Sequence, residues 1–379
     1  MIYSKLFSID LGLVATLSEN ARLAGAIDLA GNYLSDDLPS SIANDLKNLP
    51  DDMFNRVVST YGLIELRQEI SNKMRFQFDR TYCPEKEITI TNGSNHALFA
   101  AMTAFLEEGD EVILFEPAAE NYLPIIMLSG ARPIYVTLKE PDFHIDWEEV
   151  TRRVTGNTKM IIINTPHNPT GMVLSELDML RLQKVINGTR IIVLSDECFE
   201  HLIYDGASHQ SVALYPKLAE CSIIVNSMSQ SCRVAWPVGY CVAPADMMQQ
   251  IRYILHVTDG GHFAPLQMLL AQCLAKKEIY RDLAQRYGRK RDRFNQMMTE
   301  RTRFVPVSTN GTCYQLFSYA KISDERDKEF ARRLFDELGV ATVPFSTFFH
   351  EKQKRSLLRF NFGRPDELLD RAVEALSRL

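Results

Sequence analysis

Seven short runs rich in isoleucine and valine, separated by helical patterns, constrain the fold of this chain more than any other feature. Apolar runs of this kind are typical of strands buried on both faces, and their alternation with helices favours a mostly parallel α/β sheet. The runs are EITIT (87–91), EVILF (111–115), PIYVTL (133–138), MIIIN (160–164), RIIVLS (190–195), SIIVN (222–226) and VGYCVA (238–243). We therefore predict a mostly parallel seven-stranded sheet flanked by helices.

One helix can be placed in detail from its sequence. Ser175 and Asp178 have the spacing of a capping box at the start of SELDMLRLQKVI, which predicts a helix over 175–186. We expect Leu177, Leu180 and Ile186 to face the core.

The pattern changes after about residue 245, where long helices over 265–302 precede a shorter mixed α/β segment with an amphipathic packing helix at 366–376. This change predicts a smaller α/β C-terminal domain. The expected boundaries are an N-terminal arm with part of the small domain (1–40), a large α/β domain (41–270) and a small domain (271–379).

Composition argues against several classes of function. The net charge of -6 and the absence of basic runs predict no nucleic-acid partner. No apolar run reaches the roughly 18 residues of a membrane span, and the first residues lack a signal-peptide pattern, so we expect a cytoplasmic protein without a membrane partner. The seven cysteines show no CxxC or Cys/His grouping, which favours free thiols and gives no metal site.

Polar residues follow several of the predicted strands. Ligands of open parallel sheets bind at the carboxyl ends of the strands. We therefore expect one pocket lined by NGSN after the first run, EPAAENY after the second, TPHNPTG after the fourth, DECFEH after the fifth and SMSQS after the sixth.

Four segments together resemble a known family. They are NTPHNPTG (164–171), SDECFEH (195–201), NSMSQSCRVAWPVGY (226–240) and LLRFNFGRPDELLDRAVEAL (357–376). Their order and spacing resemble the class I/II aminotransferases of the fold-type I pyridoxal-phosphate (PLP) superfamily, in the methionine and kynurenine aminotransferase branch. The resemblance implies a fold-type I structure, a small-molecule carboxylate substrate and a homodimer.

Several site residues follow from the resemblance. It implies that Asn168 bonds the phenolic oxygen of the cofactor and that Asp196 pairs with its pyridine nitrogen. Arg359 matches the arginine that grips the substrate carboxylate, because a bidentate fork fits a planar anion. Asn168 and Tyr122 are also expected at the substrate.

The phosphate site is implied in the same way. Ser94, Asn95 and Ser227 match positions that offer donors to the phosphate near a helix N-terminus.

The chain departs from the family pattern at the position of the Schiff-base lysine. Gln230 occupies this position if one residue has been lost before Trp236; without that gap the position falls on Ser229. A glutamine amide cannot condense with an aldehyde. No lysine lies between Lys217 and Lys276.

Other positions differ as well. Pro237 stands where a cation for the phosphate is expected, and Arg233 is the candidate to replace that cation. Phe199 replaces a tyrosine next to the cofactor oxygen. Ala118 or Ala119 stands in place of a stacking aromatic residue, and Val57 in place of a tyrosine that the partner subunit lends to the phosphate.

Structural roles remain open for the same residues. Asp196 could be a structural carboxylate, Asn168 a turn residue, and Arg359 the partner of an internal Asp or Glu. Besides Gln230, we take as candidate catalytic residues a further set of side chains that can move a proton: His262, His167, Ser229, Cys232 and Tyr240.

Three hypotheses for the function follow. The first is an enzyme that acts on an amino-acid-like or 2-oxo-acid-like carboxylate without an internal PLP aldimine, by cyclisation, condensation, isomerisation or elimination, and so without a covalent cofactor. The second is a transaminase homologue that binds PLP or its amine form (PMP) noncovalently. The third is a ligand-binding pseudoenzyme without turnover.

Overall fold

The molecule is organised around a seven-stranded central sheet. The computed structural model describes residues 12–34, 40–259, 261–351 and 355–379. The strand order is β2-β8-β7-β6-β5-β3-β4. These strands are β2 (Ile88–Thr91), β3 (Glu111–Glu116), β4 (Arg132–Thr137), β5 (Thr158–Asn164), β6 (Ile192–Asp196), β7 (Ser222–Ser227) and β8 (Gly239–Val242). Each coincides with one of the seven predicted runs, so the predicted sheet is confirmed.

The sheet is parallel except at one edge. Strands β4, β3, β5, β6 and β7 pair in parallel, whereas β8 runs antiparallel to both β7 and β2. The five parallel strands therefore present their carboxyl ends along one edge of the sheet, where ligands of such sheets bind.

Helices cover both faces of the central sheet. Val112 and Leu114 of β3 belong to a core cluster on one face, and Ile113 and Phe115 belong to the cluster on the other. Both faces are therefore apolar, as the uninterrupted runs predicted. The helices along this part of the chain are α3 (Ile64–Phe78), α4 (Ser94–Phe105), α5 (Tyr122–Leu128), α6 (Trp147–Arg153), α7 (Glu176–Ile186), α8 (Pro216–Ala219), α9 (Met228–Cys232) and α10 (Ala245–Thr258).

The helix predicted over 175–186 is α7, and its capping box between Ser175 and Asp178 is present. The predicted buried face is wrong in part. Leu177 and Leu180 are exposed, and the core contacts come from Met179, Leu182 and Ile186. These three positions are three and four residues apart, so they lie on one side of the helix. Of the three residues that we predicted for the buried face, only Ile186 lies on this side.

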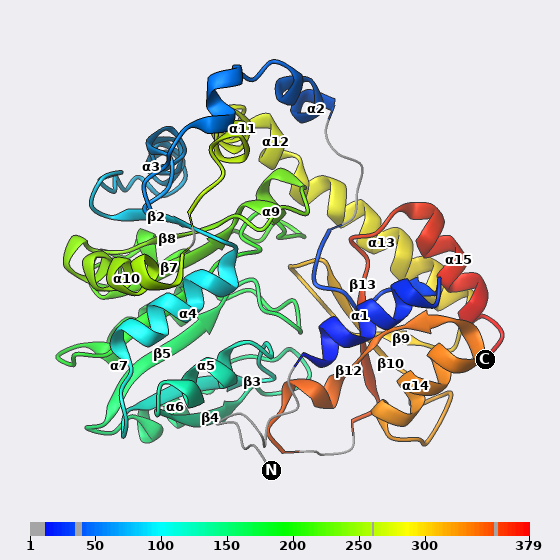
Figure 1. Cartoon of the computed structure of the whole chain (residues 1–379). Helices are drawn as coiled ribbons and strands as arrows, with labels where there is room; N and C mark the ends of the chain where they lie inside the picture. Colours follow the sequence, from blue (N-terminus) through cyan, green and yellow to red (C-terminus); the bar gives the residue numbers. More distant parts are fainter. Residues whose placement is uncertain (1–11, 35–39, 260, 352–354) are drawn as a thin grey trace, which may run out of the picture.

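A smaller antiparallel sheet lies beside the central one (Figure 1). Its order is β12-β13-β10-β9, and a separate parallel pair joins β1 to β11. The strands are β1 (Ile27–Asp28), β9 (Val305–Pro306), β10 (Tyr314–Ser318), β11 (Val340–Ala341), β12 (Val343–Pro344) and β13 (Leu357–Asn361), and the helices next to them are α1 (Leu13–Leu23), α14 (Asp327–Leu338) and α15 (Asp366–Leu376). The predicted C-terminal packing helix is α15, which buries Leu369, Ala372, Val373 and Leu376.

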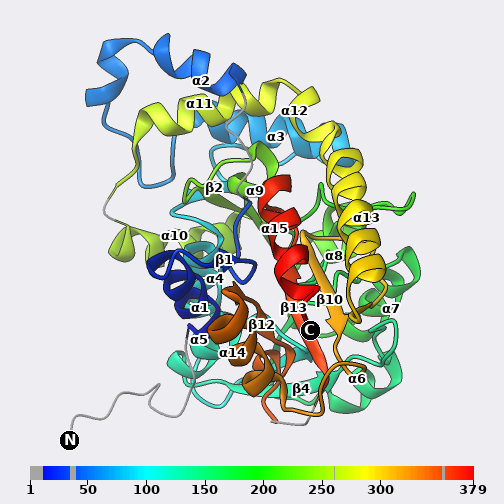
Figure 2. The same ribbon diagram turned by 90° about the vertical axis from the view of Figure 1, so that its right-hand side faces the viewer.

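The long helical stretch after residue 264 consists of three helices, α11 (Ala264–Ala275), α12 (Glu278–Arg281) and α13 (Leu283–Arg301). Figure 2 shows α13 running along the molecule, with α11, α12 and α2 (Ser40–Lys47) gathered at one end. The short 3-10 helices are η1 (Asp51–Asn55), η2 (Val212–Leu214) and η3 (Phe345–Phe348).

The domain boundaries at residues 40 and 270 stay a prediction, and residues 1–11 of the predicted arm lie outside the described residues. Of the helices in the described ranges, none combines the length and the hydropathy that a bilayer-spanning segment requires.

Candidate functional site

A cavity of about 570 Å³ opens at the carboxyl edge of the central sheet. The segments expected after the first, second, fourth, fifth and sixth predicted strands all contribute to it, so the predicted convergence of these strand ends is confirmed. The part of the molecule around the smaller antiparallel sheet and the β1–β11 pair, which we call the small lobe, also lines the cavity with residues from three separate places in the chain. Its main lining residues are Asn32, Tyr33, Asn92, Gly93, Ser94, Asn95, Ala119, Glu120, Asn121, Tyr122, Asn168, Asp196, Cys198, Phe199, Ser227, Ser229, Gln230, Trp236, Pro237, Tyr314 and Phe348.

Asp196 ends β6 at the floor of the cavity. Its Oδ2 accepts a 2.6 Å hydrogen bond from the hydroxyl of Tyr122, and its Oδ1 accepts one of 3.2 Å from the amide of Cys198. Burial raises the pKa of the Asp196 carboxyl, although the hydrogen bond from Tyr122 opposes this rise. A buried carboxylate of this kind is stabilised by a cationic or protonated group placed next to it.

Arg359 of β13 is fully buried behind the cavity. Its Nη1 donates to Oδ1 of Asn168, and its Nη2 donates to the carbonyl of Ala30 and to Oδ1 of Asn32, each at 2.8 Å. Among the described residues, no carboxylate lies within 4.0 Å of the guanidinium. Burial lowers the pKa of Arg359, so an anion bound there would offset the cost of its buried charge.

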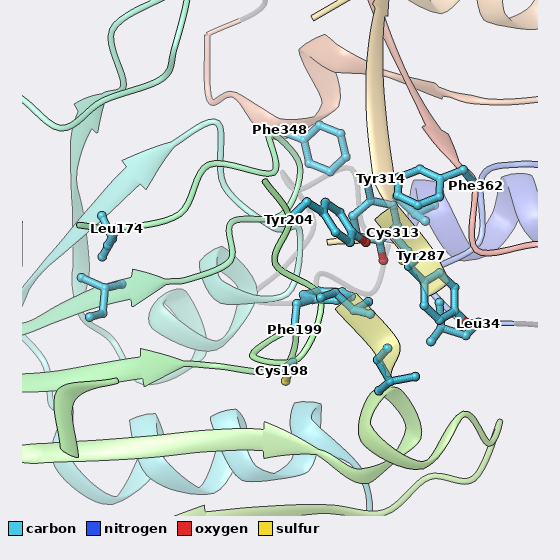
Figure 3. Close-up of a cluster of buried hydrophobic side chains, with 14 of the residues drawn as sticks. Leu34, Leu174, Cys198, Phe199, Tyr204, Tyr287, Cys313, Tyr314, Phe348 and Phe362 are labelled. Carbon is cyan, nitrogen blue, oxygen red and sulfur yellow. The ribbon is translucent and has the colours of Figure 1, made fainter. Parts of the chain in front are cut away.

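Aromatic side chains surround this guanidinium and continue into the cavity. The guanidinium carbon Cζ of Arg359 lies 4.1 Å from the ring centre of Tyr314 and 5.1 Å from that of Phe348. Phe199 meets Tyr314 edge-on, with 5.5 Å between ring centres. Figure 3 shows Phe348 at the top of the cluster, Tyr314 below it and to its right, and Phe199 lower down, with Cys198 beneath Phe199. The site thus combines a buried cation with an apolar wall.

The segment around residues 30–33 is held by side chains from the C-terminal end of the chain. Besides the bonds of Arg359, Nδ2 of Asn361 donates to the carbonyls of Gly31 and Tyr33, at 2.7 and 2.9 Å. Arg364 donates to the carbonyl of Tyr33 at 3.0 Å. The segment that carries Asn32 and Tyr33 into the cavity therefore depends on β13 and the residues after it.

Helix α4 begins at the opposite side of the cavity. Gly93 precedes it with φ of 83°, and no side chain caps the amides of its first turn. A Cβ on Gly239 would lie 2.5 Å from the carbonyl carbon of Gly93 and 2.6 Å from the nitrogen of Ser94. Glycine at position 239 therefore lets β8 approach the helix start, and uncapped amides there are suited to a phosphate or another anion.

Gln230 lies in α9, directly after β7, and lines the cavity. Its side chain is buried, and its Oε1 has no hydrogen-bond partner among the residues that the structure describes. The neighbouring Ser229 donates from its hydroxyl to the carbonyl of Trp236 at 2.5 Å. Of the residues described around the cavity, none is a lysine, an arginine or a histidine.

Several predicted candidates lie away from the cavity lining. His167 is buried and shares a 2.8 Å hydrogen bond with Thr170, and His262 contacts Asp259 at 2.9 Å. Tyr240 accepts from Lys73 at 2.7 Å. Cys232 and Arg233 do not line the cavity either. Of the replacement catalysts, the structure brings only Ser229 to the cavity.

Lys73 belongs to a second buried polar group, beneath the end of β6. Single ligand atoms of Glu197, Glu200 and His209 lie within 4.8 Å of one another, a spacing that a metal ion could use. Glu200, however, already forms an ion pair with Lys73. Burial opposes ionisation of Glu200, yet Lys73 and the nearby histidines bring its pKa to about 2. The cation in this polar group is therefore the ammonium group of Lys73.

Sequence reasoning missed Asn32 and Phe348 as site residues, and it expected Glu120 only as part of the segment EPAAENY. Glu120 follows β3 within EPAAENY, so its place after a predicted strand was a usable signal. Asn32 and Phe348 lie in the small lobe, and no local pattern in the sequence connects them with the central sheet.

Residues 24–376 of the chain match the family described as aminotransferase class I and II. The methionine aminotransferase of Escherichia coli is 33% identical over 378 residues, which cover 99% of this chain and 98% of the relative. The kynurenine–oxoglutarate transaminase of Dictyostelium discoideum is 30% identical over 366 residues, which cover 86% and 84%. This chain belongs to the class I and II aminotransferase family.

Solved structures agree with this assignment. The crystal structure identified with a methionine aminotransferase function in Escherichia coli superposes with a TM-score of 0.93 at 32% identity, over 100% of both chains. The N-succinyldiaminopimelate aminotransferase of Mycobacterium tuberculosis gives 0.94 at 29% identity, also over 100% of both. The predicted fold-type I structure and the predicted branch are confirmed, and the protein is an enzyme.

These similarities contradict two predictions. We expected chemistry without an internal PLP aldimine, or a noncovalent or noncatalytic use of the fold; the relatives matched over nearly the whole chain are named aminotransferases or transaminases. We also expected no covalent cofactor, whereas PLP enzymes of this family hold the cofactor as a Schiff base. Both predictions are wrong: they gave the departures from the family pattern at Gln230 and four other positions more weight than the whole-chain similarity warrants.

The described residues suit PLP in most respects. Asp196 is a buried carboxylate that would gain from a protonated ring nitrogen, and the uncapped start of α4 offers amides for a phosphate. Asn168 lines the same cavity. The described lining supplies neither an amine for a Schiff base nor a cation for the phosphate, and Phe199 lines it in place of a tyrosine.

Proposed function

We propose that this protein is an aminotransferase that moves an amino group between an amino acid and a 2-oxo acid, with PLP as its cofactor. The observation that carries this proposal is Arg359, a fully buried guanidinium whose hydrogen-bond partners among the described residues are all neutral oxygens. Such a group fits the α-carboxylate shared by amino acids and 2-oxo acids. The names of the relatives supply the reaction type.

Each element of the site has a defined task under this proposal. PLP supplies an aldehyde that reacts with amino groups and a ring that accepts electrons. Asp196 would keep the ring nitrogen protonated, and Tyr122 would keep the Asp196 carboxyl ionised by donating to it. Ser94, Asn95 and Ser227 would bind the phosphate at the start of α4, with Arg359 orienting the substrate carboxylate.

We also propose that Gln230 stands at the position where the family carries its lysine. It lies at the start of α9, directly after β7, and its side chain reaches the cavity. A neutral amide moves no proton at neutral pH. The proton transfer at the substrate Cα therefore has the least support from the side chains of this chain, and we expect turnover to rise when an amine is placed at this position.

An amino-group transfer assay tests the function. The purified protein is given PLP, individual amino acids and a 2-oxo acid acceptor, and formation of the new amino acid is followed by mass spectrometry. We expect transfer that is abolished by Arg359→Ala and unchanged by the surface variant Arg152→Ala. Absence of transfer from every proteinogenic amino acid would refute the proposal.

We further propose a homodimer. Phe54, Val57, Tyr253, Val257 and Phe263 are exposed apolar side chains, and the rings of Phe54 and Phe263 are in edge contact at 6.3 Å. Exposed apolar side chains that touch one another, as Phe54 and Phe263 do, are typical of protein interfaces.

We place the protein in the cytoplasm, since all seven cysteines are free, as expected in a reducing compartment.

A further inference from the structure

A pair of side chains joins the small lobe to the central sheet. Glu116 ends β3, and His350 follows η3. Oε1 of Glu116 accepts a 2.6 Å hydrogen bond from the amide of His350, and its Oε2 shares one of 2.7 Å with Nδ1 of the same residue. The imidazole also stacks on Tyr135 of β4, with 3.9 Å between ring centres and 3° between ring planes. Neither Glu116 nor His350 belongs to the described lining of the cavity, and the proposed function gives their contact no task.

A third bond between the same two segments leads to the cavity. The amide of Ala118 donates to the carbonyl of Phe348 at 2.8 Å. The ring of Phe348 lines the cavity, and its centre lies 5.1 Å from Cζ of Arg359. The contact between residues 116–118 and 348–350 therefore fixes an aromatic ring against the guanidinium that we assign to the substrate carboxylate.

The burial of Glu116 makes this contact costly to open. Glu116 is 2% exposed, and burial raises the pKa of its carboxyl, whereas the hydrogen bonds from His350 lower it. Movement of η3 away from the sheet would take these donors from a buried acid, which costs more than the loss of a surface hydrogen bond. The imidazole of His350 is 38% exposed, and its Nε2 lies 3.8 Å from Oε1 of Glu351. It can therefore be replaced without opening the core.

We propose that Glu116 and His350 are positioning residues of the substrate site: they hold Phe348 against the guanidinium of Arg359, so that a bound carboxylate is shielded from water. The inference rests on the proposed function, because it takes Arg359 as the site of that carboxylate. An ion pair covered by an apolar ring lies in a lower effective dielectric than one open to solvent, so its attraction is stronger. Loss of the cover should weaken the binding of a carboxylate by about tenfold.

The test replaces the side chain of His350 in two ways. His350→Ala removes the bond from Nδ1 and the stacking on Tyr135. His350→Asn places an amide where Nδ1 lies, and an amide can donate or accept. The matched control is His144→Ala, which removes a bond of the same length, 2.7 Å, to Asp142 at the surface. Calorimetric titration of the PLP-treated proteins with pyruvate measures affinity without requiring turnover.

We expect pyruvate to bind about tenfold more weakly to His350→Ala and with wild-type affinity to His350→Asn and to His144→Ala. Phe348→Ala should show the same loss, and the double variant of His350 and Phe348 should lose no more, because both changes act through one ring. Wild-type affinity in His350→Ala, or additive losses in the double variant, would overturn the proposal. An equal loss in His350→Asn would also overturn it, because the bond to Glu116 would then not be what holds Phe348.

Hydrogen exchange of the ligand-free proteins tests the contact itself. The amide of Ala118 should exchange about tenfold faster in His350→Ala than in the wild type, because its bond to Phe348 opens more often. The amide of Leu138, which donates to the carbonyl of Glu116 at 2.7 Å, should keep its rate and serves as the internal reference. An unchanged rate at Ala118 would count against Glu116 and His350 as positioning residues.

A separate variant keeps the two proposals apart. Arg359→Ala should lose most of its affinity for pyruvate, because it removes the group that binds the carboxylate. If Arg359→Ala binds pyruvate as the wild type does, or if the wild type binds none, the proposed function fails whatever the exchange at Ala118 shows. If Arg359→Ala loses affinity and His350→Ala does not, the function stands and the roles of Glu116 and His350 are limited to stability.

Discussion

The hydroxyl of Tyr122 donates a 2.6 Å hydrogen bond to Oδ2 of Asp196, and both side chains are buried. The two residues are 74 positions apart in the chain, one at the start of α5 and the other at the end of β6. The hydrogen bond holds the pKa of Asp196 lower than burial alone would leave it. Tyr122 therefore acts on the site through Asp196.

Replacing Tyr122 by phenylalanine should make Asp196 protonate at a higher pH. A neutral Asp196 cannot stabilise a protonated ring nitrogen, so the acidic limb of the pH profile of kcat/KM should move to higher pH. Loss of a hydrogen bond to a charged group should also cost about 1.5 to 3 kcal/mol of stability. Tyr215→Phe is the control, because its hydroxyl bonds Gln210 outside the cavity; an unmoved pH profile in Tyr122→Phe would contradict the role.

Replacing Arg359 by lysine should weaken the binding of 2-oxo acids by about tenfold to a hundredfold, because lysine keeps the charge and loses the planar fork. Titration calorimetry with a series of 2-oxo acids measures the loss. Arg333→Lys serves as control, since Arg333 is paired with Glu325 at 2.8 Å and does not line the cavity. The control variant should lower the free energy of unfolding with little change in the affinity for 2-oxo acids. If instead Arg359→Lys binds 2-oxo acids as the wild type does and the control binds them more weakly, Arg359 is not the carboxylate site.

Replacing Gln230 by lysine should raise the rate of amino-group transfer by about a hundredfold, within the usual contribution of a positioned acid or base. Borohydride reduction followed by peptide mass spectrometry should locate the cofactor on residue 230 in this variant. Gln230→Met is the control. It should leave the rate unchanged and add up to about 1 kcal/mol of stability, because it removes a buried oxygen without a partner. If Gln230→Lys transfers amino groups no faster than the wild type, the position of the family's lysine is not residue 230.

Acid should destabilise the protein well above the pH at which most carboxylates titrate. Burial lowers the pKa of both His167 and His201 to about 3. The unfolded chain binds protons at these histidines below about pH 6.5, whereas the folded protein does not. The free energy of unfolding should therefore keep its full value above pH 6.5. Below pH 6.5 it should fall by about 1.4 kcal/mol per histidine for each unit of pH.

Urea unfolding across this pH range measures the slope. His201→Gln should make it shallower, whereas His144→Gln should not, because His144 is exposed. An unchanged slope in His201→Gln would show that this histidine is not the source of the effect.

Replacing Val257 by aspartate should disrupt the proposed dimer, because a charge would be buried at the centre of an apolar interface. Val257 is 83% exposed in the single chain, so the substitution should leave the folded subunit intact. Light scattering coupled to gel filtration gives the mass of the variant. Val305→Asp, at an exposed position on β9, is the control. If Val257→Asp has the same mass as the Val305→Asp control, the interface lies on another surface.

The sequence was sufficient for the elements whose signals are local. Isoleucine and valine runs identified β5 and β7, and Ser175 with Asp178 located the start of α7. Strand direction is not encoded in such runs, so the antiparallel orientation of β8 could not be predicted from them. The buried face of α7 was misjudged because leucines occur on two sides of this helix.

From local pattern the cavity lining was predictable where its residues follow strands of the central sheet, as Asp196 and Asn168 do, whereas Arg359 of β13 was expected from the family resemblance. The partners of Arg359 at residues 30–32 lie more than 320 positions away, and no local pattern indicates such a contact. The function was misjudged for a physical reason of another kind. The chemistry of the Gln230 amide is certain, but departures at this residue and four others do not determine the reaction of a pocket that many residues build.

The bonds from Arg359, Asn361 and Arg364 to the backbone of residues 30–33 have a consequence for biosynthesis. Those early residues leave the ribosome long before the strand that holds them has been made. The central sheet can form first, because all seven of its strands precede residue 243. The binding cavity is therefore among the last parts of the protein to mature, and a chain cut short before residue 359 would carry a folded sheet with an open, incompetent pocket.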